Sequence, residues 1–218
     1  MVGMVYHTYS LNSDVSINFD EQRLDHYNLY NARYVVAPEG QSFPPFVRPL
    51  QQFGQHRLYQ VDTTGYFDLV VSDLAFAGES RDLYLAASTW LGSRMPVAKM
   101  YPVVSIGGSS LGNERPAPLA SAKDIIPAMD PPVGPPRGTV VSEEAGSNYF
   151  AADVNVKRES MLLLKATYHP NWRATVDSVK TDTFMLMPSF VGIELSPGNH
   201  SVRIEYRPRR LRVILLVL

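Results

Sequence analysis

The chain has 218 residues and a formal net charge of -1, with 20 lysines and arginines against 21 aspartates and glutamates. This balance excludes the concentrated basic surface of a typical nucleic-acid-binding protein, while the 45% hydrophobic share is enough for a folded core. The absence of cysteine excludes disulfides, thiolate metal sites and cysteine nucleophiles. The 12 tyrosines and 17 prolines favour a loop-rich β protein over a helical bundle.

Residues 1–106 predict a small α+β part. The sequence from Phe19 to Tyr30 predicts a helix, and Asn31–Ala37 predicts a strand that ends at the following proline and glycine. Strands predicted at His56–Asp62 and Phe67–Ser72 are separated by a short turn, so we expect them to form a hairpin.

A second helix is predicted at Arg81–Leu91. Leu83, Ala86, Ala87 and Trp90 fall on one side of it and predict its buried face. A strand is predicted next, at Tyr101–Ile106. Residues 107–138 are then rich in proline and glycine, which predicts a linker or a loop wrapped over the surface between two parts of the chain.

Residues 139–210 carry a strong strand signal. In Tyr149–Val156 apolar and polar residues alternate, while Met161–Tyr168 is apolar on both faces and predicts a central strand covered on each side. Further strands are predicted at Trp172–Asp177, Thr183–Met187, Val191–Leu195 and His200–Tyr206. The predicted fold is mainly β, with an antiparallel β-sandwich of immunoglobulin-like or jelly-roll kind in the C-terminal half.

Two motifs of the C-terminal half resemble the YfhO-like bacterial membrane proteins. The segment from Tyr168 to Ser178 follows that family's Tyr-x-Pro-Gly-Trp-x-Ala-x-Val-Asp-Gly pattern, and Ser196–Val202 follows its Pro-Ala-Gly-x-His-x-Val pattern. Upstream, Leu29–Val36 is similar to that family's Leu-Asn-Val-Arg-Tyr-Val-Val strand. Asn171 and Ser178 depart from the pattern, because glycine is usual at both places, and the second departure puts the Asp-Gly hairpin in doubt.

The resemblance implies a polytopic membrane protein related to the C-type, multi-pass glycosyltransferases, which use lipid-linked sugars. It implies that this chain is a domain on the extracytoplasmic side of a bacterial cell membrane. No part of the chain matches the loops that carry that family's catalytic carboxylates, so no catalytic residue is carried over.

The apolar run at residues 211–218 has two readings. It is too short to span a membrane, which takes about 20 residues, so it could be a last buried strand. It could also be the start of a truncated transmembrane helix, a reading that the resemblance favours and that four preceding arginines between 207 and 212 would suit.

The candidate ligand-binding residues lie around one aromatic corner: Tyr168, His169, Trp172, Arg173 and Asp177. An exposed tryptophan face suits the apolar side of a sugar ring. Trp172 also alternates with Ala174 and Val176, and this spacing favours a place in the sandwich core instead. Arg173 and Asp177 could bind sugar hydroxyls, but their places in a strand and a turn favour solvated side chains instead.

Catalytic and cofactor motifs are missing from the sequence. The five histidines show no metal-ligand spacing, and neither Gly-x-Ser-x-Gly nor a glycine-rich nucleotide loop occurs. We therefore expect no metal, no cofactor and no catalytic residue in this chain. The predicted function is a non-catalytic domain that holds a glycan or cell-envelope polymer. The alternatives are a soluble carbohydrate-active hydrolase, which needs a carboxylate pair, and a purely structural or interaction module.

Overall fold

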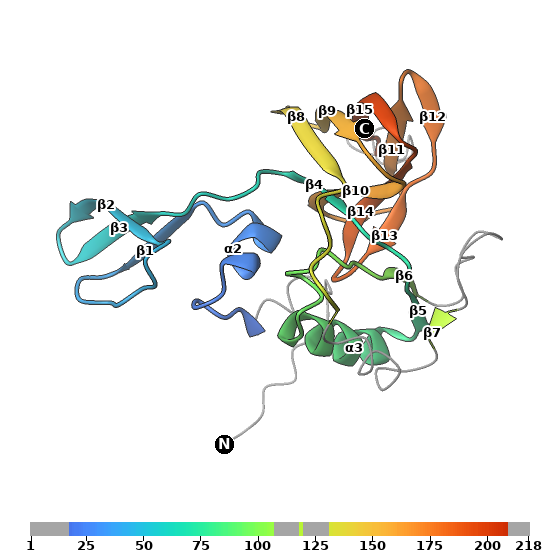
Figure 1. Cartoon of the computed structure of the whole chain (residues 1–218). Helices are drawn as coiled ribbons and strands as arrows, with labels where there is room; N and C mark the ends of the chain where they lie inside the picture. Colours follow the sequence, from blue (N-terminus) through green and yellow to red (C-terminus); the bar gives the residue numbers. More distant parts are fainter. Residues whose placement is uncertain (1–17, 107–117, 120–130, 209–218) are drawn as a thin grey trace, which may run out of the picture.

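The computed structural model describes residues 18–106, 118–119 and 131–208, and these form three β-sheets and two helices (Figure 1). Two of the sheets pack face to face, and the third projects from them. The chain is therefore mainly β with a minor helical part, as predicted, and its C-terminal half contributes to a sandwich.

The outer sheet of the sandwich has five antiparallel strands, all from the C-terminal half. Its order is β12-β11-β15-β9-β8. The bounds are β8 Gly138–Ala145, β9 Tyr149–Val156, β11 Trp172–Val176, β12 Val179–Thr181 and β15 Gly198–Tyr206. The alternation predicted for Tyr149–Val156 is confirmed, because Ala152, Val154 and Val156 are buried while Asp153 is exposed.

The central sheet combines strands from both halves of the chain in the order β4-β10-β14-β13-β6-β5-β7. The bounds are β4 Phe67–Val70, β5 Ala75–Gly78, β6 Val103–Ile106, β7 Pro118–Leu119, β10 Ser160–Thr167, β13 Phe184–Leu186 and β14 Phe190–Leu195. β5 runs parallel to β6 and β7, whereas the other pairs are antiparallel. A parallel pair needs a crossover, which helix α3 (Ser80–Gly92) supplies between β5 and β6.

Strand β10 explains why the central sheet is buried on both faces. Leu162 and Leu164 belong to the cluster that packs against the outer sheet, while Met161 and Leu163 belong to the cluster on the opposite face. β10 pairs with β4 on one side and with β14 on the other. The prediction of a central strand covered on each side is confirmed.

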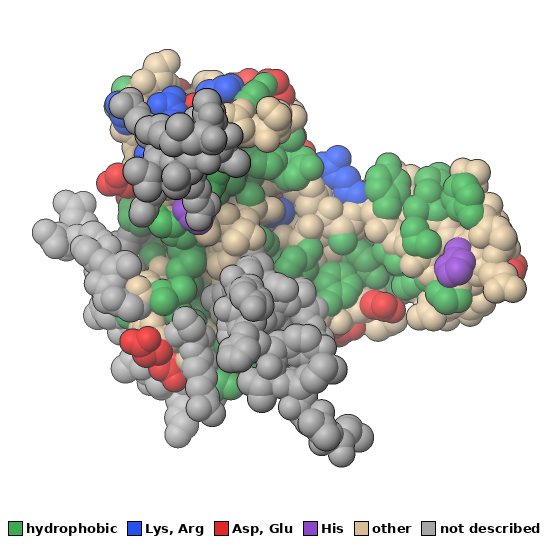
Figure 2. Space-filling model, turned by 180° about the vertical axis from the view of Figure 1, so that it is seen from behind, with side chains coloured by type: hydrophobic (Ala, Val, Ile, Leu, Met, Phe, Trp, Pro, Cys, Tyr) green, Lys and Arg blue, Asp and Glu red, His purple; other side chains and the backbone are tan. Residues whose placement is uncertain are grey.

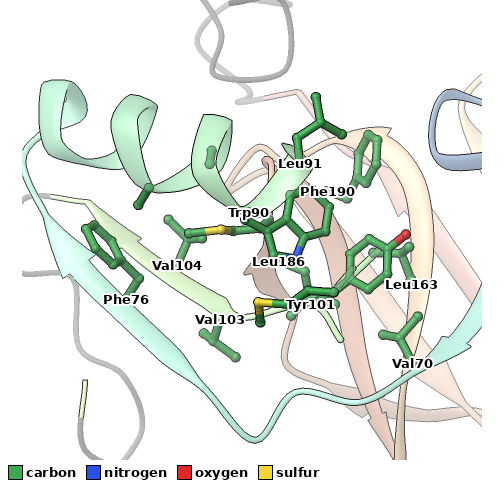
Figure 3. Close-up of a cluster of buried hydrophobic side chains, with 14 of the residues drawn as sticks. Val70, Phe76, Trp90, Leu91, Tyr101, Val103, Val104, Leu163, Leu186 and Phe190 are labelled. Carbon is green, nitrogen blue, oxygen red and sulfur yellow. The ribbon is translucent and has the colours of Figure 1, made fainter. Parts of the chain in front are cut away.

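Helix α3 covers the second face of the central sheet (Figure 3). Leu83, Ala86, Ala87 and Trp90 are fully buried there, so the predicted inner face is correct. The Trp90 indole N–H donates to the carbonyl of Met100 at 2.8 Å, and its ring meets Tyr101 edge to face. The polar edge of this large core residue is thus satisfied without water.

The arm is the third sheet, in the order β1-β3-β2, and Figure 1 shows it extending away from the sandwich. The bounds are β1 Tyr34–Pro38, β2 Arg48–Phe53 and β3 His56–Gln60. The predicted hairpin between residues 56–62 and 67–72 is wrong: β3 pairs with β1 and β2, and β4 leaves the arm to join β10. β2 was not predicted, because a proline such as Pro49 argues against a strand in the sequence. β2 tolerates it because it lies at the edge of the sheet, with every side chain exposed.

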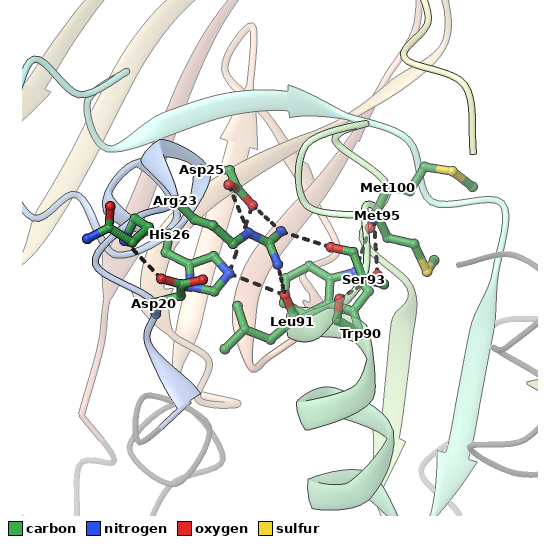
Figure 4. Close-up of polar contacts among 10 residues, drawn as sticks. Asp20, Arg23, Asp25, His26, Trp90, Leu91, Ser93, Met95 and Met100 are labelled. Carbon is green, nitrogen blue, oxygen red and sulfur yellow. Dashed lines mark hydrogen bonds and ion pairs between the residues drawn. The ribbon is translucent and has the colours of Figure 1, made fainter. Parts of the chain in front are cut away.

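Helix α2 (Leu24–Tyr30) joins the arm to the body (Figure 4). The Arg23 guanidinium donates to the carbonyls of Leu91 and Ser93 at 3.0 and 2.8 Å, and it pairs with Asp25 at 2.6 Å. His26 reaches the Leu91 carbonyl as well, at 3.2 Å. These groups cap the carbonyl end of α3, where the helix dipole favours positive charge.

A second tether links the arm to the outer sheet. Arg33 pairs with Glu143 of β8 at 3.2 Å, and the other carboxylate oxygen of Glu143 accepts the backbone N–H of Tyr66 at 2.8 Å. Gly65 has a φ of +86°, a backbone conformation that other residues rarely adopt, and a Cβ there would also displace the Glu143 carboxylate. Glycine is therefore favoured at this crossing.

The predicted division of the chain runs through residues 107–138, most of which fall outside the described residues. Strands β4 and β6 of the 1–106 segment pair with β10 and β13 of the 139–210 segment, so one sheet contains strands from both sides of that division. The apolar run at 211–218 also falls outside the described residues.

Candidate functional site

The aromatic corner lies where the chain passes from β10 to β11. The Trp172 backbone N–H donates to the His169 carbonyl at 3.0 Å and closes a tight turn, in which the Asn171 N–H donates to His169 Nδ1. The Trp172 indole N–H donates to the Thr167 carbonyl at 3.0 Å. Its ring centroid lies 5.3 Å from Tyr206 and 6.1 Å from Phe150. Trp172 is therefore half-buried at the margin of the sandwich core.

The neighbouring candidates gather at the same corner. The His169 ring meets Tyr206 edge to face at 5.5 Å, and the Tyr168 N–H donates to the Ser189 carbonyl. Arg173 turns its guanidinium back onto the carbonyls of Pro170 and Trp172, at 2.6 and 2.8 Å. Part of its hydrogen-bonding capacity thus holds the turn.

Asp177 does not share this corner. It follows β11, about 16 Å from Trp172 at roughly 3.3 Å per strand residue. Its carboxylate accepts from His200 Nδ1 at 2.7 Å and from the Ser201 N–H at 2.9 Å. The hydrogen bond from His200 is the larger cause, and together with the Ser201 bond it holds the pKa of Asp177 below its usual value. The same bond to Asp177 raises the pKa of His200. The predicted site residues therefore form two separate groups.

A cavity with a volume of about 750 Å³ lies elsewhere. One wall is the proline-rich segment 131–136, and the opposite wall comes from β4 and the loop at residues 97–100. The start of β8 and Arg158, just beyond β9, close it. Gly138 of the cavity lining pairs with Val156, about 20 Å along β9 from Phe150, so the cavity lies toward the opposite end of the outer sheet from Phe150 and Trp172.

A buried ion-pair network lies beside this cavity. Asp68 of β4 is 7% exposed and receives Lys165 Nζ at 2.9 Å and Lys99 Nζ at 2.5 Å. Lys165 has no exposed side-chain surface and also donates to the Thr64 hydroxyl and the Gly65 carbonyl, at 2.7 and 2.8 Å. All three of its ammonium protons thus have acceptors.

Burial and charge oppose each other in this network. Burial alone would raise the pKa of Asp68, but the ammonium groups of Lys165 and Lys99 hold the pKa of that carboxyl below its usual value. Burial lowers the pKa of Lys165, and Asp68 opposes that shift. All hydrogen-bond donors of Lys165 are used by groups within the protein, whereas the Lys99 side chain is 47% exposed at the cavity.

The cavity combines cationic groups with an aliphatic wall. Lys99, Arg137 and Arg158 line it against the carboxylates Asp68 and Asp73, and Asp68 is already paired with Lys165 behind it. Proline and valine side chains supply the apolar surface. Such a cavity can hold an extended, negatively charged molecule.

The Asp68 network was not predicted from the sequence. The sequence does contain one indication of it, which is a single charged residue within each of two apolar strands. Asp68 lies in Phe67–Val71, and Lys165 follows Leu162–Leu164. Such charges are rarely buried unless paired, so each one predicts a partner of opposite charge.

Within the described residues, no group of three or more histidines and acidic residues could hold a metal ion. No helix in the described ranges is long and apolar enough to cross a membrane.

The C-terminal part of the chain carries the decisive similarity. Residues 138–218 match the family model of the bacterial membrane protein YfhO. The match begins at β8, and it includes the aromatic corner, Asp177 and Lys165. The resemblance to YfhO noted from the motifs is confirmed over this range. Asp68 and Lys99 precede the YfhO match. No curated protein and no solved structure matches the chain.

Proposed function

We propose that the chain is a non-catalytic extracytoplasmic domain of a bacterial membrane protein related to the lipid-linked-sugar glycosyltransferases. Its role is to hold a glycan or another cell-envelope polymer, and the polymer lies in the 750 Å³ cavity. The YfhO match supports the membrane parent. The cavity's excess of cationic groups beside an aliphatic wall is the observation that carries the binding role.

The ligand chemistry follows from the cavity lining. Lys99 offers ammonium protons beyond its one bond to Asp68, and Arg137 and Arg158 add two guanidinium groups. Charge-assisted bonds from these groups suit carboxylates or phosphates. The proline wall suits the apolar face of a sugar ring. A glycan that carries acidic groups satisfies both features.

A non-catalytic role agrees with the lowered pKa of the Asp68 carboxyl. Glycoside hydrolysis needs one carboxyl with a raised pKa as the acid and a second carboxylate as the base or nucleophile. The pKa of Asp68 is lowered by its two lysines, so it is unsuited to donate a proton. The hydrolase alternative predicts release of reducing sugar ends from a polysaccharide, and the present proposal predicts none.

Calorimetric titration of the full chain with polygalacturonate tests the binding role, with neutral dextran as the comparison. We expect binding of the acidic polymer and at least about tenfold weaker binding after Lys99→Gln, which corresponds to about 1.4 kcal/mol. Lys180→Gln, an exposed change on β12 outside the cavity lining, is the matched control. Equal affinity for dextran, or equal loss in both variants, would overturn the assignment.

The aromatic corner remains a second candidate for sugar binding, because Trp172 keeps part of its ring exposed beside Tyr206. If Trp172 stacks on sugar, Trp172→Ala abolishes glycan binding and leaves the unfolding midpoint nearly unchanged. If Trp172 is mainly a core residue, the same change costs about 3–5 kcal/mol of stability. The two readings are separated by measuring both quantities on one variant.

The extracytoplasmic placement has a direct test, because the chain contains no cysteine. Val179 is 69% exposed on β12, so Val179→Cys gives one accessible thiol. In intact bacteria that make the protein, a membrane-impermeant maleimide should label the Val179→Cys variant more strongly than the unchanged protein. Labelling only after permeabilisation would place the domain on the cytoplasmic side.

A further inference from the structure

The arm has one covered face and one bare face. Val35, Ala37 and Tyr59 point to the covered face, where they pack with Tyr27, Val47 and Val61. Strand alternation sends Tyr34, Val36 and Leu58 to the other side, and the pairing of Val36 with Leu58 puts them on one surface. Within the part of the chain that the structure describes, nothing covers this second surface.

The bare face carries several exposed apolar side chains. Tyr34 is 60% exposed, Val36 68% and Phe53 54%, and Leu50, at the register shift of β2, is 55% exposed. These are four of the eleven large hydrophobic residues exposed in the described ranges, and the other seven are spread over separate elements. Figure 2 shows hydrophobic side chains gathered over the arm. Single exposed apolar residues are ordinary, but a contiguous group on a projecting sheet marks an interaction surface.

The size of this surface argues against a second copy of the chain. Four side chains with these exposures present on the order of 400 Å². A stable protein interface buries about 800 Å² on each partner. Strand-to-strand pairing at the β2 edge is also disfavoured, because Pro49 lacks an N–H and the β2–β3 register shifts between Pro49 and Gln51.

The polar groups on the bare face suit a lipid surface. By register, Arg48, Gln51, His56 and Gln60 share this face, and no carboxylate does. Asp62, just past β3, pairs with Arg48 at 2.5 Å, and Glu39 follows β1, so the margin of the face is close to neutral. Tyrosine, phenylalanine and arginine are the side chains that favour the boundary between headgroups and acyl chains.

We infer that the bare face of the arm, whose apolar side chains are Tyr34, Val36, Phe53 and Leu58, docks onto a lipid bilayer at the boundary between headgroups and acyl chains. The match of residues 138–218 to a membrane-protein family places such a surface within reach of the domain. Docking at this face is independent of the polymer cavity. Because the contact is mainly apolar, it persists at high salt.

A tryptophan reporter tests the docking in the full chain. Phe53→Trp puts an indole on the bare face, and Val179→Trp puts one at a comparably exposed site on β12. Vesicles of equal parts phosphatidylcholine and phosphatidylglycerol should shift the Phe53→Trp emission to the blue, and brominated lipids should quench it. The Val179→Trp emission should not respond. An unresponsive Phe53→Trp protein, or an equal response at both sites, would overturn the inference.

A loss-of-docking variant completes the test. Tyr34→Ser with Val36→Thr removes apolar surface from exposed positions, and the fold is checked by circular dichroism. Vesicle flotation should then fall at least about tenfold, while Val141→Thr with Val179→Thr, equally exposed on the outer sheet, should float like the unchanged chain. If the unchanged chain instead forms dimers that the Tyr34/Val36 variant abolishes, the face serves a second copy and not lipid. Intact polygalacturonate binding in that variant separates this result from failure of the cavity.

Discussion

Ser178 occupies a backbone conformation that serine rarely adopts. It follows Asp177 in the two-residue loop between β11 and β12, and both residues have positive φ values, 69° and 51°. This is the geometry that favours glycine at the second position. The hairpin that the sequence put in doubt is therefore present, with serine in the strained place. Asp177 tolerates its conformation better, because its carboxylate bonds across to Ser201.

Ser178→Gly should raise the free energy of unfolding by about 1 kcal/mol, since glycine relieves the left-handed strain. Urea denaturation measures the change. Ser201→Gly is the matched control, because Ser201 lies in extended strand β15, where glycine loses more conformational freedom on folding and lowers stability. A decrease in stability for both variants would show that Ser178 is not strained.

The contributions of His26 and His200 to folding stability should depend on pH in opposite directions. His200 has acceptors at both ring nitrogens, Asp177 and the Ser196 carbonyl, so its protonated form is favoured and its pKa is raised. His26 is buried and its Nδ1 accepts the Asp20 N–H (Figure 4), so its Nε2 donates to Leu91. Burial, with the charge of Arg23, lowers the pKa of His26.

The sign of each contribution follows from these shifts. Stability from His200 is complete below its unfolded pKa of about 6.5 and is lost as pH rises through the raised folded value. Stability from His26 is complete above about pH 6.5 and is lost as pH falls toward the lowered folded value. In urea denaturation, His200→Gln should therefore cost more at about pH 5.5 than at about pH 8.5, and His26→Gln the reverse. The same pH trend in both variants would contradict the assignment.

At the scale of elements, the buried Asp68–Lys165 ion pair reinforces the backbone pairing between β4 and β10. Asp68→Asn leaves the Lys165 ammonium, which has no exposed surface, without its carboxylate. We expect a loss of about 3–5 kcal/mol in urea denaturation. Lys99→Met removes a partner that is 47% exposed and should cost less than about 1 kcal/mol.

A double variant isolates the buried charge as the cause. Asp68→Asn combined with Lys165→Met removes both members of the pair and should recover part of the loss. If Asp68→Asn alone is no more costly than Lys99→Met, the network is not a structural link between the two strands.

Where the chain is regular, its hydrophobic pattern predicts the helices and strands well. The face of α3 and the two-sided burial of β10 were predicted, because periodicity records which side of an element meets the core. Strand partners were predicted poorly. Thr64-Gly65 resembles a hairpin turn, yet β4, which follows it, does not pair with β3. It pairs with β10, nearly a hundred residues later in the chain. Such pairings depend on tertiary packing that no local pattern encodes.

The candidate site shows the same limit. The aromatic corner was visible as a motif because its residues are consecutive, and the structure does bring Tyr168, His169, Trp172 and Arg173 together. Asp177 was grouped with them on sequence proximity, but an extended strand separates residues that are close in number. The cavity was not predicted, because its walls come from four segments that are far apart in the chain.

At the scale of the whole molecule, the part that matches YfhO is not a complete sandwich. Residues 138–218 lack β4, which pairs with β10, and β6, which pairs with β13. They also lack α3, so Leu163 and Phe190 would lose the helix that covers them (Figure 3). The central sheet would then expose a hydrophobic face and an unpaired edge.

A fragment that starts at Pro131 and runs to the end of the chain should therefore fail to fold alone. We expect poor dispersion of its amide resonances and dye binding to exposed apolar surface, because the second face of β10 and β14 is uncovered. Adding a separately produced fragment of residues 1–106 should restore dispersion, since it supplies β4, β6 and α3. A well-dispersed spectrum for the C-terminal fragment by itself would show instead that the five-stranded outer sheet, with β10, β13 and β14, holds a core without the helical layer.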